Sequence, residues 1–255
     1  MNRILAFTKR NIKELIRDPL SYIFCLGFPL IMLTLMTIMN DMIPQEANMT
    51  LFRMDQLAPG IAVFGLSFIM LFATLLLSKD RSGAFLARLF ATPMTALDFI
   101  MGYVLPLVLL ALAQLLICLL AGGLIGLFSN VSLSPWRLIL TGLTLIPCAL
   151  FFLFMGLLFG TLFNDKAAPP CCSILISACG VLGGIWFSLD TIPARHVFGI
   201  ICRTLPFSHF VDTGRQVLTG QFHDFGAHMA IGLAWTVGVG VLAVVIFHLR
   251  MKRDV

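Results

Sequence analysis

Seven cysteines and five histidines are the side chains of this sequence best suited to redox or metal chemistry. Six of the cysteines lie in or against apolar stretches, and the adjacent Cys171 and Cys172 have no histidine or acid nearby at a spacing typical of metal ligands. Four histidines share one connection, but no two of them stand four residues apart and no acidic pair accompanies them. We therefore expect buried hydrophobic cysteines, solvated histidines, no metal site and no catalytic residue.

Residues that convert energy are also missing from the sequence. It contains no glycine-rich loop of the kind that cradles nucleotide phosphates, so we expect the chain not to be an ATPase. Ion-coupled carriers keep ionisable groups at membrane depth, whereas at that depth the apolar stretches here hold only Gln114 and a few hydroxyl groups as polar side chains, and their one histidine, His248, stands at the cytoplasmic end of the last stretch. A transporter of this composition would take its energy from a soluble partner.

The elements that hold these residues are predicted to be membrane helices. The sequence is 59% hydrophobic and 11% charged, with a mean hydropathy of +1.00, whereas soluble domains carry charge on about a quarter of their residues. We predict an all-α membrane protein forming a single transmembrane domain over residues 1–255. Its six predicted spans are residues 20–39, 61–78, 102–128, 138–163, 170–189 and 229–249.

The positions of Lys and Arg predict the orientation of these spans. Twelve of the cations fall on one side of the predicted topology and five on the other, and positively charged short loops stay in the cytoplasm. We therefore expect both termini to be cytoplasmic. The net charge of +5 does not indicate a nucleic-acid partner, because the cations lie between apolar spans and not on a soluble basic face.

Residues 1–19 are predicted to form an amphipathic helix that lies in the membrane interface. At about 100° per residue, the apolar side chains fall on one half of the helix and the cations, including Lys9, Lys13 and Arg17, on the other. Such a helix lies apolar side down, with its cations facing anionic head groups, so membrane lipid is an expected partner. A plain basic flank of the first span is the alternative.

Residues 79–93 are predicted to form a second amphipathic helix on the cytoplasmic side, ended by Pro93. A short exposed helix binds a partner through its few apolar residues. We expect docking through Phe85, Leu86, Leu89 and Phe90, with Arg88 steering the encounter. A helix that only lies on lipid is the alternative.

Residues 190–228 form an outer connection that is too apolar for a solvated loop. Pro193 and Pro206 divide it into two short helices, 194–204 and 208–219, which we expect to be re-entrant or interfacial. Asp212 and Arg215 stand three residues apart on the second helix, so they can pair and hold it over the outer exit as a gate. Solvated surface charges are the alternative.

Three segments together resemble the type-2 ATP-binding-cassette (ABC) export permeases, the transmembrane subunits of drug, lipid or polysaccharide exporters. LARLFATP at residues 86–93 is similar to the coupling helix of that family, with Thr92 and Pro93 at its end. GGIWFSLDTIP at residues 183–193 resembles the stretch that leaves the fifth span. LPFSHFVDTGR at residues 205–215 resembles the outer re-entrant helices, with Pro206 at their junction.

The resemblance implies an assembly in a bacterial-type plasma (inner) membrane. Two copies of a cytoplasmic ABC ATPase would dock on a pair of permeases, this chain with a second copy or a homologue. MgATP would bind the ATPase, so no cofactor is expected in this chain. The complex would export an amphipathic substrate, either a drug-like compound, a lipid or a lipid-linked glycan. A membrane anchor or regulatory subunit that transports nothing is the alternative, followed by an ion-coupled carrier.

Overall fold

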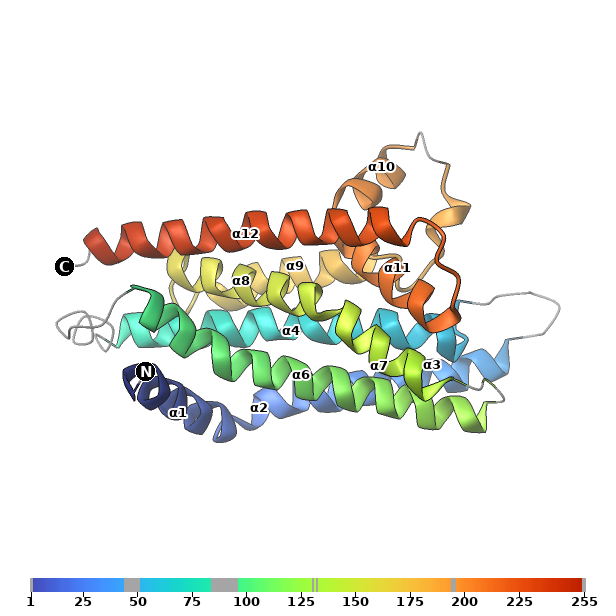
Figure 1. The fold of residues 1–255 in the computed structure, drawn as a ribbon, viewed down its shortest axis with the longest axis horizontal. Coiled ribbons are helices and arrows are strands. Elements are labelled where there is room, and N and C mark those ends of the chain that lie inside the picture. Colours follow the sequence, from blue (N-terminus) through green and yellow to red (C-terminus); the bar gives the residue numbers. More distant parts are fainter. Residues whose placement is uncertain are drawn as a thin grey trace.

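The computed structural model describes residues 2–43, 51–83, 96–129, 131, 133–193 and 196–253, and within these ranges it contains helices and no strand. The long helices run side by side along one axis, and both ends of the chain lie at the same end of the bundle (Figure 1). The predicted all-helical fold is confirmed for the described residues.

The amino-terminal third begins with α1 (Asn2–Ile16), which is followed at once by the first candidate span. That span joins α2 (Pro19–Tyr22), a π-helical turn (Ile23–Gly27) and α3 (Phe28–Met42). Asp18 caps its start, because its carboxylate accepts hydrogen bonds from Leu20 N and from Ser21 Oγ. Pro29 lacks an N–H group, and the helix widens to a π turn in the residues just before it.

Helix α4 (Met54–Ser82) is the centre of the bundle. In its most apolar stretch 83% of the residues are buried, against 39% or less in each other candidate span. It packs against α6 (Ala96–Phe128), α8 (Ile146–Leu162), α9 (Ala168–Leu182) and α11 (Pro206–Thr219). Gly156 and Gly160 of α8 let the backbones approach, since a Cβ at position 156 would lie 2.6 Å from the Met70 carbonyl oxygen.

Prolines and glycines decide where the remaining spans break. The predicted span 138–163 is divided into α7 (Pro135–Thr144) and α8, and the break falls just before Pro147. The predicted span 170–189 is the 15-residue helix α9, which ends at Gly183 and is followed by Gly184 with φ +62°. Among the residues that the structure describes, five helical segments are long and apolar enough to cross a membrane: Pro19–Met42, Met54–Ser82, Asp98–Phe128, Pro135–Leu162 and Phe225–Arg250. The sixth crossing stays a prediction.

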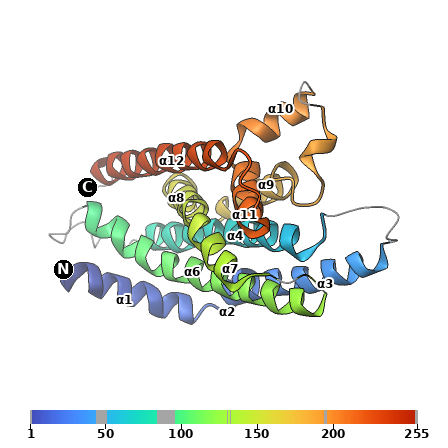
Figure 2. The same ribbon diagram turned by 45° about the vertical axis from the view of Figure 1, so that its right-hand side comes forward.

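The outer connection folds back toward the bundle, as Figure 2 shows. It contains a 3₁₀ turn (Leu189–Thr191), α10 (Val197–Thr204) and α11, and it leads into α12 (Phe225–Arg253). The two short helices predicted here are present, although α11 begins at Pro206 and not at Ser208. Helix α11 buries Phe207 and Phe210 against Phe151 of α8, so it is part of the core.

Candidate functional site

Helix α1 is held on the bundle by an aromatic contact with α6. The Phe7 ring lies 5.0 Å from the Tyr103 ring and 6.1 Å from the Phe99 ring, both edge to face. Gly102 makes room for it, because any side chain there would meet the Phe7 ring. Asn11 is fully buried beside this contact and donates a hydrogen bond to the Gly102 carbonyl oxygen at 2.9 Å. One face of α1 is therefore fixed against α6.

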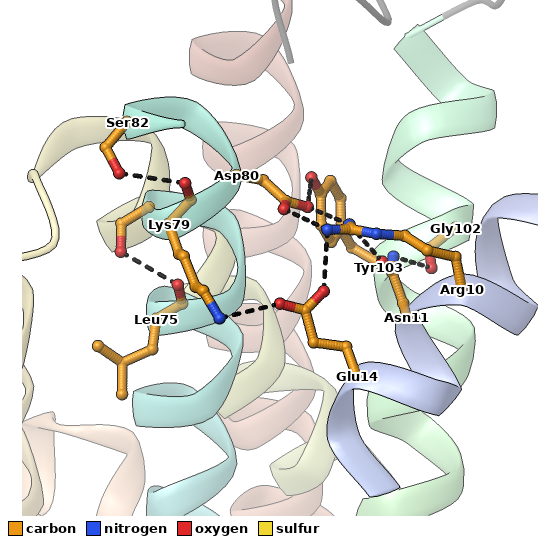
Figure 3. Close-up of polar contacts among 10 residues, drawn as sticks. Arg10, Asn11, Glu14, Leu75, Lys79, Asp80, Ser82, Gly102 and Tyr103 are labelled. Carbon is orange, nitrogen blue, oxygen red and sulfur yellow. Dashed lines mark hydrogen bonds and ion pairs between the residues drawn. The ribbon is translucent and has the colours of Figure 1, made fainter. Parts of the chain in front are cut away.

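A network of charged side chains joins α1 to the end of α4 (Figure 3). Arg10 donates to both carboxylate oxygens of Asp80, with Nη2 at 2.6 Å from Oδ1, and the Asp80 side chain is only 4% exposed. Tyr103 of α6 donates to the same carboxylate at 2.8 Å. Arg10 also contacts Glu14 at 2.9 Å, and Glu14 contacts Lys79 at 3.2 Å. This network is the Arg10–Asp80–Tyr103 clamp.

The clamp is held together by electrostatic contacts. The hydrogen bond to Asp80 raises the pKa of Arg10, so its guanidinium stays charged. A buried carboxylate with a bidentate arginine and a phenol has its acceptors satisfied, and removal of one partner leaves a buried charge without its counterpart. Arg81 connects this end of α4 to a fourth helix, α8, because it donates hydrogen bonds to the carbonyl oxygens of Gly160 and Thr161. The clamp end of α4 is thus bonded to α1, α6 and α8.

The clamp corrects one sequence prediction. Residues 79–82 were expected to open the coupling helix, yet they form the last turn of α4, which ends at Ser82 before Gly83. The helix continues through these polar residues because their charges find partners on α1 and α8. The predicted docking residues Phe85, Leu86, Arg88, Leu89, Phe90, Thr92 and Pro93 lie outside the described residues.

The predicted interface cations Lys9, Lys13 and Arg17 are exposed and line a cavity of about 810 Å³ between α1 and α4. Their role at the membrane interface stays a prediction. The sequence did not predict the clamp, because Arg10 and Asp80 are 70 residues apart. The one available signal was the acid Asp80 at the end of a long apolar stretch, because an ionised side chain in such a place is usually paired with an opposite charge.

At the opposite end of the bundle, Arg215 of α11 bonds to two backbone carbonyl oxygens. Its Nε lies 3.0 Å from the Gln56 oxygen of α4, and its Nη2 lies 3.0 Å from the Gly184 oxygen that follows α9. The predicted partner Asp212 is 3.8 Å away and is 30% exposed. The pair predicted from sequence is therefore present, but the shorter bonds of Arg215 hold α4 and the Gly184 turn. Pro206 is the first residue of α11.

A pair of histidines lies beside Arg215, and the prediction of solvated histidines is wrong for one of them, because His209 is buried. His209 Nε2 is 2.8 Å from the Arg203 carbonyl oxygen, which only accepts, so Nε2 carries the proton. His209 Nδ1 then accepts from His228 Nδ1 of α12 at 2.8 Å. Burial lowers the pKa of His209, which favours this neutral form. These side chains line a cavity of about 550 Å³ at this end of the bundle, the predicted outer end, together with Gln56, Asp212 and Arg215.

No metal-binding cluster of three or more His, Cys, Asp or Glu occurs among the residues that the structure describes. Long apolar helices around a buried central helix, with charged clusters at the two ends, define a multi-pass membrane protein. Residues 2–219 match the ABC-2 type transporter family, and the chain belongs to that family. It is therefore the membrane permease component of an ABC transporter, whose ATPase is a partner subunit. No curated protein matches the sequence.

Proposed function

We propose that this chain is the permease subunit of an ATP-driven exporter that moves an amphipathic substrate, a drug-like compound, a lipid or a lipid-linked glycan. Two copies of a cytoplasmic ABC ATPase bind MgATP and drive it, and a second permease copy or a homologue completes the pathway. The complex lies in a bacterial-type plasma membrane with both termini in the cytoplasm. The position of the two termini at one end of the bundle supports this orientation (Figure 1).

One observation carries the proposal: the buried central helix α4 is bonded near its two ends to two different helices, α1 and α11. Asp80, near its last residue, bonds to Arg10 of α1, and the Gln56 carbonyl, near its first residue, bonds to Arg215 of α11. At about 1.5 Å per residue, its 29 residues span roughly 43 Å. A packed helix of this kind moves as a unit.

The proposed mechanism follows from that connection. Closure of the ATPases on ATP pushes the segment after Gly83 and the amphipathic helix α1. Because the clamp joins α1, α4 and α6, these helices move together and not separately. The displacement reaches Arg215 and α11 through α4, so the outer end opens when the inner end closes. Substrate passes between the two permeases by alternating access.

Coexpression with the ATPase encoded nearest to this chain tests the proposal. We expect the two proteins to copurify and the ATPase activity to rise when amphipathic compounds are added. Leu89→Asp places a charge among the predicted docking residues, so it should reduce copurification severalfold. Phe222→Asp is the matched control, because Phe222 is an exposed apolar residue (59%) near the outer cavity and far from the clamp.

Two results would contradict the proposal in different ways. Equal copurification of Leu89→Asp and Phe222→Asp would show that the predicted docking residues do not bind the ATPase. Copurification without any substrate stimulation or export would instead favour a membrane anchor or regulatory subunit.

A further inference from the structure

A cavity of about 810 Å³ lies beside the clamp, between α1 and α4. Helix α1 packs against α6 through Phe7, so its other side is left facing α4 across an open groove. Lys79 and Glu14 reach toward each other from the two helices and close one end of it (Figure 3). The cavity size falls in the range of sites that hold a small molecule or a lipid head group.

The groove carries an excess of positive charge. Five cations line it, Lys9, Arg10, Lys13, Arg17 and Lys79, against the two carboxylates of Glu14 and Asp18. Both carboxylates are occupied, because Glu14 contacts Arg10 and Lys79, and Asp18 caps the next helix. Arg10 and Lys79 are therefore paired with carboxylates, and the excess positive charge of the groove lies on the other three cations.

Three of these cations form a stripe. Lys9, Lys13 and Arg17 follow each other at intervals of four residues, are exposed, and have no ion pair with any described residue. Like charges at this spacing destabilise a helix unless an anion lies between them. An anionic group bound along the stripe removes that repulsion.

The opposite wall of the groove is apolar. Phe72, Leu75 and Leu76 of α4 line it, and Leu15 of α1 adds to it. Lys79 marks the polar limit of this wall, one helical turn beyond Leu75. The cationic stripe and the apolar wall thus lie at the level where a membrane span ends, and there head groups meet acyl chains.

We propose that this groove binds one anionic phospholipid of the membrane leaflet at the clamp end of the bundle. The phosphate lies against Lys9, Lys13 and Arg17, and the acyl chains lie on Phe72, Leu75 and Leu76. A free phosphate ion would use the cations but not the apolar wall, and a neutral lipid would use the wall but not the cations. The bound lipid fills the space between α1 and α4 next to the clamp, so it supports the position of α1.

Native mass spectrometry of the purified full chain in detergent tests this site. The probes are phosphatidylglycerol, phosphatidylcholine and inorganic phosphate, each titrated separately. We expect one retained phosphatidylglycerol per chain, bound at least tenfold more tightly than phosphatidylcholine, with a rise in the thermal unfolding temperature that inorganic phosphate does not produce. The double variant Lys9→Gln, Lys13→Gln should bind phosphatidylglycerol at least tenfold more weakly.

The matched control is the double variant Lys166→Gln, Arg250→Gln. It removes the same charge from the region of the same bundle end, but neither residue lines the groove. Leu75→Ser tests the apolar wall and should also weaken phosphatidylglycerol binding. Helical circular dichroism confirms that each variant is folded, and the exposed positions of Lys9 and Lys13 favour that result.

Three results would overturn the site. An equal loss of phosphatidylglycerol affinity in the two double variants would mean that the lipid is attracted to positive charge anywhere at this end of the bundle. Equal binding of phosphatidylglycerol and phosphatidylcholine would mean ordinary bulk lipid, and an equal thermal shift with inorganic phosphate would mean an anion site without an acyl-chain wall. The measurement needs no ATPase, so its failure is distinct from failure of the proposed transport function.

Discussion

At the residue scale, Asp80 adds a charged contact between α1 and the rest of the bundle. Its carboxylate accepts hydrogen bonds from Arg10 of α1 and from Tyr103 of α6. The Asp80 side chain is buried, so little water reaches these bonds. Hydrogen bonds between charged partners contribute more than neutral ones, about 1.5 to 3 kcal/mol. Because Arg10 is one-third exposed, we take the lower part of that range for its bond to Asp80.

Asp80→Asn should therefore lower the free energy of unfolding by about 1.5 to 2 kcal/mol, since it removes the charge but keeps the shape. A double-mutant cycle with Arg10→Gln, followed by thermal unfolding, measures the coupling between the two side chains. Asp165→Asn is the control, because Asp165 is exposed in the connection between α8 and α9. Additive effects of the two clamp substitutions would show that the pair contributes nothing.

His209 gives the outer end a dependence on pH. Burial lowers its pKa, and His228 adds to this, while the Arg203 carbonyl and Asp212 act in the opposite direction. Protonation would turn Nδ1 into a donor facing the proton of His228 and break their bond. Because the folded-state pKa lies below the unfolded value of about 6.5, the stabilisation is complete above that pH and is lost as the pH falls through the folded-state pKa.

Thermal unfolding of the purified protein between pH 8 and pH 5 should thus show a falling midpoint below about pH 6.5. His209→Gln should flatten this decrease, because it removes the titrating group. His223→Gln should leave it unchanged, since His223 is 94% exposed. If His209→Gln and the unmodified protein lose stability in parallel, other groups cause the effect.

At the scale of elements, the sequence predicted the helices better than their ends. Span positions follow from apolar runs, and hydropathy averages over about 20 residues. The end of α4 was misplaced because Lys79 and Asp80 look like the start of a polar loop. Their partners Glu14 and Arg10 lie more than 60 residues away in the sequence, and no local pattern reveals them. The bond between Arg215 and Gln56 was not predicted for the same reason, because the two residues are 159 positions apart in the sequence.

Gly156 and Gly160 are one turn apart on α8 and let that helix pack closely on α4. A Cβ at Gly156 would lie 2.6 Å from the Met70 carbonyl oxygen, and backbone cannot yield as a flexible side chain does. Gly156→Ala should therefore destabilise the protein by about 1 to 3 kcal/mol. Gly238→Ala in α12 is the control, since nothing lies within 4 Å of its Cβ and alanine favours helix.

Thermal unfolding midpoints of the two glycine variants test this packing. We expect Gly156→Ala to unfold below the unmodified protein and Gly238→Ala at or above it. Equal midpoints would mean that α4 and α8 can separate at little cost, and α4 would then not move as one unit with its neighbours.

At the scale of the whole molecule, the question is whether the two ends of the bundle respond to each other. Helix α4 is the only described element bonded both to the clamp and to Arg215. Two polar clusters joined by one packed helix support a coupled change, but coupling is an energy that has to be measured. Arg215 is the residue to change, because it is 12% exposed and donates to α4 and to the turn after α9 at once.

Arg215→Ala should lower export, or release it from control by ATP, while membrane insertion and ATPase copurification stay as they were. Arg203→Ala is the matched control: it removes the same charge from the same outer cavity, but Arg203 donates to Ile192 and not to α4. Arg215→Lys should keep more activity than Arg215→Ala, because an ammonium group keeps the positive charge. It should remain below the unmodified protein, because an ammonium group cannot reach both carbonyl oxygens as the planar guanidinium group does. Substrate-stimulated ATP hydrolysis and export in reconstituted vesicles measure both effects. If Arg215→Ala transports and hydrolyses ATP as Arg203→Ala does, α4 carries no signal between the two ends, and Arg215 serves only to hold α11 in place.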